Sequence, residues 1–416
     1  MTTASASQPA GPDIPPPEPE LTFREMLRRA DAMREILRAR QQNCEEFGRL
    51  PEETHQDFRN AGFYRVLQPR VFGGYEFSMT DFVRLLLEIS RGCIDSGWVL
   101  SLIATQPAAF LCLFPEQTQR EAYAQLGDCR TATAAIPGGS AVADSGSYRV
   151  KGAWDYCSGC DIATHLLAAI LLRDPATQAP AGLAVALFDR EHYEIVDNWN
   201  MIGMQGTGSR RVVVGERTLP AHRVLPLTGD LWEAGERPGH ALFTNPLFLG
   251  TPLSAGGFGA CAVAVGAARG ALDIYEGILR NKKAIVPPFP FRFEMPEMQQ
   301  SFGSAQALVD TAEAALLALT DQHSELCRTS LEKSVATRAE DVRRIHRAGL
   351  QCTELAWQAV ELMFRTGGTS SASREAPLGR YFRGLAVMRT HVGRQHDHVS
   401  INVARLHFGL PALSPL

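Results

Sequence analysis

Residues 131–160 read TATAAIPGGSAVADSGSYRVKGAWDYCSGC. The apolar runs in this stretch are short, and they are separated by glycine, proline and small polar residues such as Asp144-Ser145-Gly146. Such a pattern is typical of β-strands joined by tight turns. Runs of the same kind recur at residues 164–172, 182–189, 193–200 and 210–220. The sequence therefore predicts a β-domain in the middle of the chain, at residues 131–245.

Both flanks of this region have helical patterns instead. From Phe23 the apolar residues recur at the i, i+3, i+4 spacing of an amphipathic helix, and Pro51 is expected to end that helix. After Pro252 the helical patterns are longer, and they predict an antiparallel bundle. These long segments are residues 254–279, 302–334, 339–365 and 379–407.

The predicted fold class is therefore α+β with several domains. An N-terminal helical domain at residues 21–130 is followed by a central β-barrel or sandwich at 131–245 and a C-terminal four-helix bundle at 246–416. Residues 1–20 are small and rich in proline, and such residues neither hold a helix nor pack into a core. We predict a disordered tail there.

The composition excludes several kinds of protein. The 416 residues include 41 Lys and Arg against 45 Asp and Glu, and the formal charge of −4 disfavours non-specific binding to nucleic acids. Nine cysteines without framework spacing indicate reduced thiols. Uninterrupted apolar runs such as Leu166–Leu172 are far shorter than the ~18 residues of a membrane span, and the N-terminus lacks the pattern of a secretory signal. We expect a cytoplasmic protein without nucleic-acid or membrane partners.

A Cys-x-x-Cys sequence stands at Cys157–Cys160. A structural zinc site needs four ligands, and no second pair of Cys or His with suitable spacing accompanies this one. A thioredoxin-type motif opens a helix after a strand, whereas this motif lies among strand signals. We therefore predict no metal site and assign these thiols no chemistry.

Residues 203–209 read GMQGTGS. Glycines beside Thr and Ser expose backbone N–H groups and hydroxyls, which suit a polar or anionic edge of a cofactor. The spacing matches neither the dinucleotide-binding fingerprint nor the P-loop, and a plain β-turn remains an alternative interpretation.

Histidines gather near the C-terminus, within the predicted last helix. His391 and His398 lie seven residues apart on one face of that helix, whereas His396 lies off it. A di-iron bundle would have Glu-x-x-His motifs on two helices, and these motifs do not occur. A solvated or core histidine is the alternative for each, including His407.

Four motifs follow one another along the chain. The first is Phe72–Glu76 ahead of a helix, followed by Ser96-Gly97-Trp98. The second is GAWDYCSGCD at 152–161, and the third is Trp199 with the GMQGTGS segment. The fourth is Arg380–Gly384, with His391 eight residues after Arg383. Together they resemble the motifs of the flavin-dependent aromatic hydroxylases of the acyl-CoA dehydrogenase fold, and the resemblance covers about residues 23–411.

The resemblance implies the oxygenase component of a two-component monooxygenase, similar to p-hydroxyphenylacetate and secosteroid phenol hydroxylases. Such proteins receive diffusible reduced FMN or FAD from a separate NAD(P)H:flavin reductase. They bind O2 as a flavin C4a-hydroperoxide and transfer a hydroxyl group to a small aromatic substrate. The resemblance further implies a homotetramer.

The resemblance also implies roles for individual residues. Ser158 would offer a hydrogen bond near flavin N5, and Trp154 would fix its strand beside the flavin. His391 would take or share the proton of the phenol, because imidazole titrates near neutral pH. Further flavin contacts are implied at Gly206, Thr207 and Ser209 for its polar edge, at Gly367, Gly368 and Ser370 across a subunit interface, and at Arg380 and Arg383 for phosphate. Solvated helix-surface residues are the alternative for the two arginines.

Two positions depart from the pattern of the family. Gln106 stands where a histidine of the oxygen or substrate pocket is common, so Gln106 is a catalytic candidate and the substrate need not be a simple phenol. Gln205 stands where an arginine is common, which puts that flavin contact in doubt.

Three other functions compete with this one. A true acyl-CoA dehydrogenase needs a carboxylate base, yet Met388–Val392 in the matching region contains none. An N-oxygenase of an amino substrate would use the same flavin chemistry on the same fold. A non-catalytic helical interaction protein is the third, and the retention of Ser158 and of the Gly-Thr-Gly-Ser turn counts against it.

Overall fold

The computed structural model describes residues 13–227, 238–249, 252–333, 337–391 and 396–413, so most of the predicted tail lies outside the described residues. The N-terminal third is helical, as predicted. Its elements are α1 (Phe23–Phe47), α2 (Glu52–Asn60), η1 (Phe63–Arg65), α3 (Met79–Gly92), α4 (Ile94–Ala109), η2 (Leu111–Leu113) and α5 (Glu116–Tyr123). Helix α1 begins where the Thr22 hydroxyl accepts the Glu25 N–H, and it ends before Gly48, whose φ is +59°, ahead of the predicted Pro51.

The middle of the chain forms one sheet of seven strands rather than two packed sheets. In sheet order the strands are β5 (Glu194–Val196), β6 (Arg210–Pro220), β2 (Ser147–Cys157), β1 (Thr131–Asp144), β3 (His165–Arg173), β4 (Pro180–Asp189) and β7 (Val224–Pro226). Only β1 and β3 pair in parallel; the other neighbours are antiparallel. Short 3-10 turns also occur, at η3 (Arg190–His192), η4 (Gln205–Thr207) and η5 (Ala221–Arg223).

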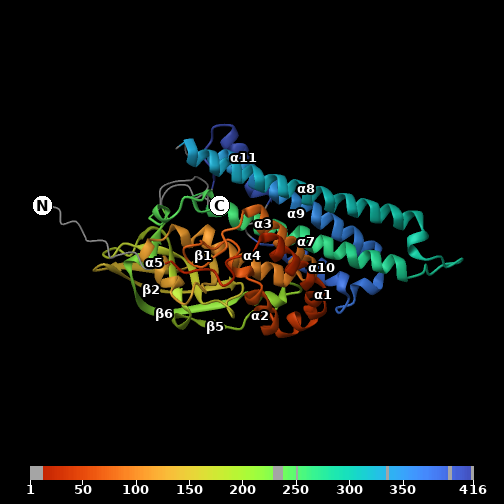
Figure 1. The fold of residues 1–416 in the computed structure, drawn as a ribbon, viewed down its shortest axis with the longest axis horizontal. Helices are drawn as coiled ribbons and strands as arrows, with labels where there is room; N and C mark the ends of the chain where they lie inside the picture. The colour runs from red at the N-terminus through yellow and green to blue at the C-terminus, as the bar shows by residue number, and fades with distance from the viewer. Residues whose placement is uncertain (1–12, 228–237, 250–251, 334–336, 392–395, 414–416) are drawn as a thin grey trace.

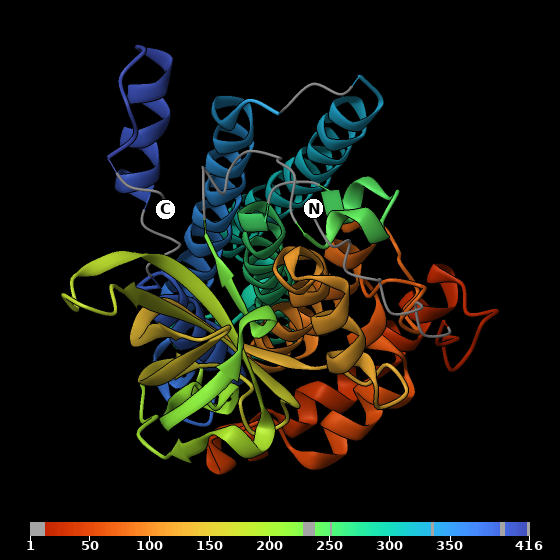
Figure 2. The ribbon, with the colours of Figure 1, turned by 90° about the vertical axis from the view of Figure 1, so that its left-hand side faces the viewer.

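The C-terminal part is built on long helices that pack side by side (Figure 1). The elements are η6 (His240–Leu242), α6 (Pro246–Leu249), α7 (Pro252–Asn281), η7 (Arg292–Glu294), α8 (Pro296–Lys333), α9 (Ala339–Thr366), η8 (Thr369–Ala372), α10 (Pro377–Met388) and α11 (His396–His407). Helix α10 packs on α7 and α9, and α11 packs on α9. Figure 2 shows the strands gathered below this bundle, with the N-terminal helices beside them.

The prediction of one last helix over 379–407 is wrong. Helix α10 ends at Met388, and a new helix begins at His396. After α10 the backbone tightens, because Thr390 N–H donates to Val387 O and His391 N–H donates to Met388 O. The Thr390 hydroxyl also donates to Val387 O, at 2.7 Å, and such local bonds compete with the helix. His391 therefore lies in a turn after α10, and it shares no continuous helix with His398.

Helix α4 occupies the junction of the three regions. It packs on α3 and α7, and it also contacts β1 and η4. Nearly all of its residues are buried, which fits a helix that is apolar on every side. Residues from α4 therefore reach both the bundle and the sheet.

Two helical segments, Ile94–Leu113 and Gly257–Asn281, are long and apolar enough to cross a membrane by length and composition. Polar residues interrupt both segments, so neither contains an apolar run of that length. Within the fold, 89% and 78% of these windows are buried. Burial of this extent is what central core helices show, and it makes their hydropathy weak evidence for a membrane.

Candidate functional site

A chain of hydroxyl groups lies where α4, the turn after β2 and the segment around η4 meet. The Trp98 indole N–H donates to Ser158 Oγ at 3.1 Å, and Ser158 Oγ lies 2.6 Å from Ser209 Oγ. Ser209 Oγ lies 2.6 Å from Thr207 Oγ1, which donates to the Met204 carbonyl oxygen at 2.8 Å. The structure thus brings together three residues that the sequence suggested, Ser158, Thr207 and Ser209, and adds Trp98.

The direction of this chain follows from its ends. A carbonyl oxygen only accepts, so the single proton of Thr207 goes to Met204 O and Ser209 must donate to Thr207. Ser158 must then donate to Ser209. Ser158 Oγ already accepts from Trp98, and a hydroxyl oxygen has two lone pairs. One acceptor position therefore remains at Ser158. All four side chains are buried, so their polar atoms need the partners that they have found.

Close contacts with helices dictate two glycines of the segment 203–209, Gly203 and Gly206. A Cβ atom on Gly203 would stand 2.5 Å from the carbonyl carbon and oxygen of Arg383 in α10. A Cβ atom on Gly206 would overlap Cys44 Sγ in α1. The backbone of Gly159 also donates to Thr207 O at 3.0 Å, which joins this segment to the turn of Ser158. The segment is therefore a docked loop and not a plain surface turn.

His391 packs against the ring of Trp98. The two rings are edge to face, with their centroids 5.5 Å apart and their planes at 70°. The Trp98 indole thus contacts His391 through its ring and Ser158 through its N–H. His391 is exposed, whereas Trp98 is buried. The structure therefore places both catalytic candidates of this pair, His391 and Ser158, beside one tryptophan.

Gln106 lies elsewhere on α4. It follows Trp98 by eight residues, which is about 12 Å along a helix axis. Its amide nitrogen donates to Leu102 O at 3.1 Å. Its amide oxygen is buried and has no hydrogen-bond partner in the part of the chain that the structure describes. The structure does not join Gln106 to the hydroxyl chain, and its catalytic role stays a prediction.

Trp154 has a packing position in the sheet. Its indole N–H donates to Ala169 O at 2.8 Å, and its ring lies in the core of the sheet. A Cβ atom on Gly139 or Gly152 would meet this ring at 2.5 Å. The side chain thus supports the strand that leads to Ser158, and its flavin contact stays a prediction.

Arg380 and Arg383 on α10 both pair with Glu45 on α1, each at 3.1 Å. A phosphate group at this place would have to compete with the Glu45 carboxylate. The pairs instead tie α10 to α1, the two helices against which Gly203 and Gly206 pack.

Gly367, Gly368 and Ser370 form a second group, just before α10. The Arg292 guanidinium donates to Gly367 O at 2.8 Å, and Lys282 Nζ donates to Ser370 Oγ at 2.6 Å. Across all residues that the structure describes, neither cation has a carboxylate partner. The sequence alone predicts only ordinary surface charge for the pair Lys282-Lys283. Lys282 and Arg292 belong to the α7–α8 connection, and they show no motif spacing with residues 367–370.

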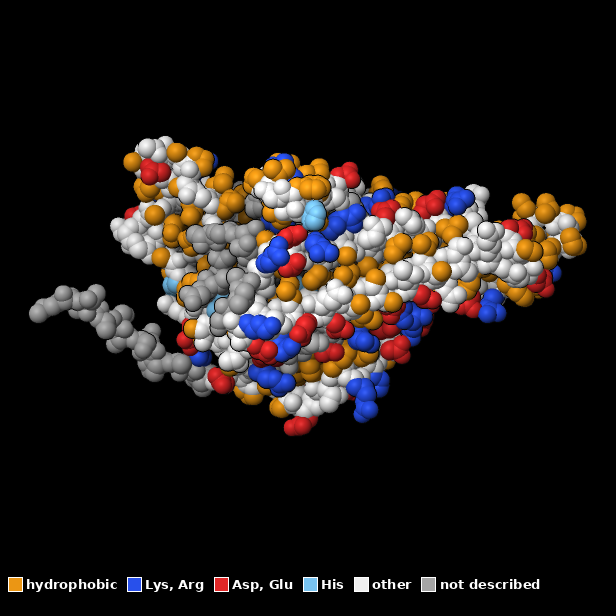
Figure 3. Space-filling view, turned by 90° about the horizontal axis from the view of Figure 1, so that it is seen from above, with side chains coloured by type: hydrophobic (Ala, Val, Ile, Leu, Met, Phe, Trp, Pro, Cys, Tyr) orange, Lys and Arg blue, Asp and Glu red, His pale blue; other side chains and the backbone are white. Residues whose placement is uncertain are grey.

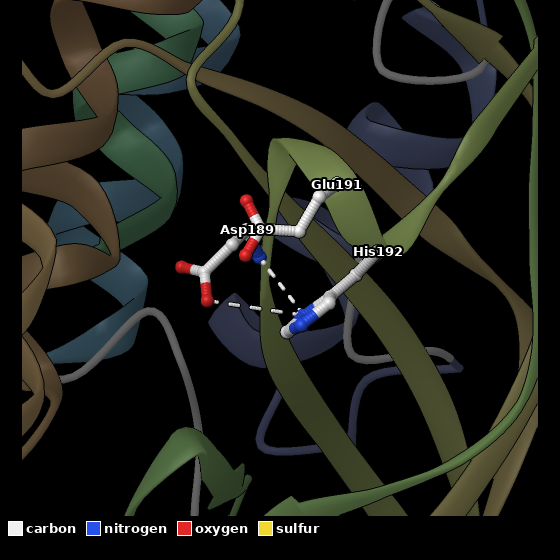
Figure 4. Close-up of side chains that lie close together, drawn as sticks. All are labelled: Asp189, Glu191 and His192. Atoms are coloured by element: carbon white, nitrogen blue, oxygen red, sulfur yellow. Dashed lines mark hydrogen bonds and ion pairs between the residues drawn. The ribbon is translucent and has the colours of Figure 1, made fainter.

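Asp189, Glu191 and His192 are the one group of described residues whose ligand atoms lie close enough for a metal ion, within 4.8 Å of one another (Figure 4). Asp189 is already engaged, since it pairs with Arg223 at 2.6 Å and with His165 at 3.3 Å. The hydrogen bond from His165 lowers the pKa of Asp189 to about 2. These contacts join β3, β4 and η5, so we assign the group to the fold and not to a metal.

The thiols of Cys157 and Cys160 are buried and donate to Trp154 O and Gly208 O, at 3.5 and 3.6 Å. Burial raises the pKa of Cys160 to about 12, and it raises that of Cys157 as well. Both thiols therefore remain protonated at neutral pH.

Comparison with known sequences places these observations in a family. The profile of the acyl-CoA dehydrogenase N-terminal domain matches residues 17–125, and that of the acyl-CoA dehydrogenase C-terminal domain matches residues 258–396. Together the two profiles cover more than half of the chain. The chain belongs to the acyl-CoA dehydrogenase family.

Proteins similar to this chain over most of its length are named as oxygenases. The flavin-dependent monooxygenase oxygenase subunit HsaA of Rhodococcus jostii (strain RHA1) is 28% identical over 92% of this chain and 98% of its own. The oxygenase component of the FADH2-dependent resorcinol hydroxylase of Rhizobium sp. (strain MTP-10005) is 27% identical over 92% and 94%. The crystal structure of 3-HSA hydroxylase from Rhodococcus sp. RHA1 superimposes with a TM-score of 0.85 at 27% identity, over 94% and 98%. These findings confirm the fold class and the family recognised from the sequence.

Proposed function

We propose that this chain is the oxygenase component of a two-component flavin-dependent monooxygenase, which hydroxylates a small aromatic substrate with O2 and reduced flavin. The observation that carries the proposal is the buried hydroxyl chain that leaves one acceptor position at Ser158. The oxygenase relatives in the acyl-CoA dehydrogenase family support the same activity.

The donor set of the site fits a reduced flavin, FMN or FAD, delivered by a separate NAD(P)H:flavin reductase. Reduced flavin carries an N–H group at N5, and Ser158 Oγ is a buried acceptor whose own proton is committed to Ser209. When bound, the flavin would supply the electrons that activate O2. Ser158 would keep the proton at N5, and the buried Trp98 would keep water away from it. Thr207 and Ser209 would hold Ser158 in its accepting orientation.

His391 is the proposed base for the substrate. A phenol reacts faster with an electrophilic oxygen when its O–H proton is taken or shared, and imidazole performs this task near neutral pH. Because His391 contacts the ring of Trp98, the substrate would lie beside these two side chains. A dehydrogenase would require a carboxylate base instead, and Met388–Val392 has none.

We further propose a cytoplasmic homotetramer. All nine cysteines are buried and stand outside disulfides, which suits a reducing compartment. Figure 3 shows apolar side chains gathered at the end of the molecule where α7 leads into α8, and Ile285 there is 88% exposed. Exposed apolar patches mark interaction surfaces. A second copy on this tip would lie next to Gly367, Gly368 and Ser370, as the predicted flavin contact across a subunit interface requires.

The test of the proposed function is a rapid-mixing experiment. The protein is first mixed with reduced FMN or FAD without oxygen, and O2 is then admitted with and without candidate phenols. We expect flavin reoxidation to pass through a transient absorbance that free flavin does not show, and a phenol to become hydroxylated. Reoxidation at the rate of free flavin, without a transient, would rule out the monooxygenase.

Ser158→Ala is expected to divert the reaction toward hydrogen peroxide. The change removes the acceptor for N5 and leaves the Trp98 indole N–H unpaired, which costs about 1–3 kcal/mol of folding free energy. Hydrogen peroxide released per O2 consumed should rise severalfold while flavin still binds. Ser147→Ala is the control, since its hydroxyl donates to Asp144 O at the exposed β1–β2 turn. An unchanged peroxide yield in Ser158→Ala would remove Ser158 from this role.

Lys282 donates to Ser370 and pairs with no carboxylate among the described residues, so we propose that it binds the flavin phosphate at the turn Gly367–Ser370. Lys282→Met is then expected to weaken reduced-flavin binding about tenfold, the effect of losing one charge-assisted hydrogen bond to phosphate. Titration with FMN and FAD in parallel would show which flavin uses this contact. Arg280→Met is the control, because Arg280 is exposed and pairs with Glu276 in the same helix. If both variants bind flavin like the parent protein, the turn at Gly367–Ser370 is no phosphate site.

A further inference from the structure

Asp95 stands under the loop that holds the hydroxyl chain. It lies in the first turn of α4, its residue is 5% exposed, and its Oδ2 accepts the Gly206 N–H at 2.9 Å. Three residues further along α4, Trp98 donates to Ser158. Residues three apart share a helix face. One face of α4 therefore contacts the site at two points. Asp95 binds the backbone of the loop, and Trp98 binds the hydroxyl chain.

The peptide groups around Gly206 are held from two helices. Asp95 on α4 accepts the Gly206 N–H, and the Cys44 thiol on α1 donates to Gly206 O at 3.7 Å. Gly206 can approach both because it lacks a Cβ atom, which would stand 2.8 Å from Asp95 Oδ2. The next residue is Thr207, the end of the hydroxyl chain. A shift of Gly206 would therefore displace Thr207, and Ser158 after it.

Burial raises the pKa of Asp95 to about 7, and the hydrogen bond from Gly206 opposes this rise. Glu45 on α1 raises the pKa further, whereas Arg383 and Arg380 on α10 lower it. The adjoining thiol of Cys44 stays protonated, because contact with Cys93 and burial raise its pKa well above the ordinary value. Residues 205–207 of η4 contribute no titratable group.

We propose that Asp95 is a positioning residue, whose carboxyl group fixes the backbone of Gly206 and, through it, the hydroxyl chain from Thr207 to Ser158. The strength of this hydrogen bond depends on whether the carboxyl group is ionised. The part of this proposal that concerns flavin rests on the proposed function. A carboxylate accepts a hydrogen bond about twice as strong as a neutral group does, so the loop is held more firmly once Asp95 has lost its proton.

Ionisation of Asp95 strengthens its hydrogen bond to the loop but lowers the stability of the folded protein. An unfolded chain loses the Asp proton near pH 3.9, whereas the folded protein keeps it until about pH 7. Between these two values the folded state binds more protons, so its stability falls as the pH rises and then levels off above about pH 7. From pH 5 to 8 the melting temperature of the flavin-free parent should therefore fall relative to that of Asp95→Asn, while exchange of the Gly206 amide in the parent becomes slower relative to its intrinsic rate.

The test compares Asp95→Asn and Asp95→Ala with the parent protein, all without flavin. Asn keeps an acceptor oxygen but cannot ionise, so its melting temperature should change less between pH 5 and 8 and exceed that of the parent at pH 8. Ala lacks the acceptor, and amide exchange in residues 204–209 should become at least about tenfold faster than in Asn, the loss of one hydrogen bond. Asp144→Asn, at an exposed turn, is the control and should change neither quantity.

Reduced-flavin affinity is the second measurement. We expect Asp95→Asn to stay within about threefold of the parent and Asp95→Ala to bind at least about tenfold more weakly. If the melting temperatures of the parent and of Asp95→Asn depend on pH in the same way, ionisation of Asp95 plays no part. Equal exchange of residues 204–209 in Ala and parent would overturn the positioning role. If no variant binds flavin, including the parent, the proposed function fails, and the exchange and melting results still decide the role of Asp95.

Discussion

Replacing His391 with Asn is expected to lower the rate of substrate hydroxylation at least about 100-fold, the usual contribution of a general base. Asn is polar and of similar size, so it can occupy the space beside the Trp98 ring, which lies 5.5 Å from the imidazole centroid. It cannot take a proton from a phenol at neutral pH. Reduced-flavin binding should remain within about threefold, because the hydroxyl chain at Ser158 does not include His391.

The decisive measurement is the amount of hydrogen peroxide and of hydroxylated product formed per O2 consumed. Reduced flavin, O2 and substrate yield oxidised flavin, hydroxylated product and water. Without transfer to substrate, reduced flavin and O2 yield oxidised flavin and hydrogen peroxide. For His391→Asn we expect nearly all of the O2 consumed to appear as hydrogen peroxide. His407→Asn is a matched control, since His407 is a histidine of α11 whose side chain is 71% exposed and lies 3.6 Å from Glu340. Full hydroxylation by His391→Asn would show that His391 is not the base.

The arrangement of helices and strands could be predicted because it depends on local periodicity. The strands from Thr131 to Pro226 and the long helices after Pro252 both carry their period in the sequence. The break after Met388 could not be predicted, since it arises from bonds that Thr390 and His391 make to the preceding turn. The sequence predicts strands in the β-region but leaves open whether they form a barrel or a sandwich. The order of strands within a sheet could not be predicted, because it has no local signal in the sequence.

Only those residues of the site that lie in recognisable motifs could be predicted from the sequence. Ser158, Thr207 and Ser209 belong to recognisable segments, and they do meet. Asp95 has no motif, and its bond to Gly206 joins residues 111 positions apart. Arg380 and Arg383 were assigned to phosphate because a pair of arginines suits an anion, yet Glu45 already pairs with both. Contacts between distant elements are set by packing, and no spacing in one sequence reports them.

Gly203→Ala is expected to disable the site through the backbone alone. The added Cβ atom would stand 2.5 Å from the carbonyl carbon and oxygen of Arg383 and 2.8 Å from the amide nitrogen of Gly384. These are main-chain atoms of α10, so no side chain can rotate to relieve the overlap. Either α10 or the loop must move, and overpacking of this kind costs about 1–3 kcal/mol or more in the free energy of unfolding.

Flavin binding should weaken together with stability, because the hydroxyl chain begins four residues after Gly203, at Thr207. We expect reduced-flavin affinity to fall at least about tenfold, equivalent to 1.4 kcal/mol, with the melting temperature measured in parallel. Gly215→Ala is the matched control, since a Cβ atom there meets nothing within 4 Å, and its stability should stay within about 0.5 kcal/mol of the parent. If Gly203→Ala binds flavin as tightly as Gly215→Ala does, the contact between the loop and α10 does not set the geometry of the site.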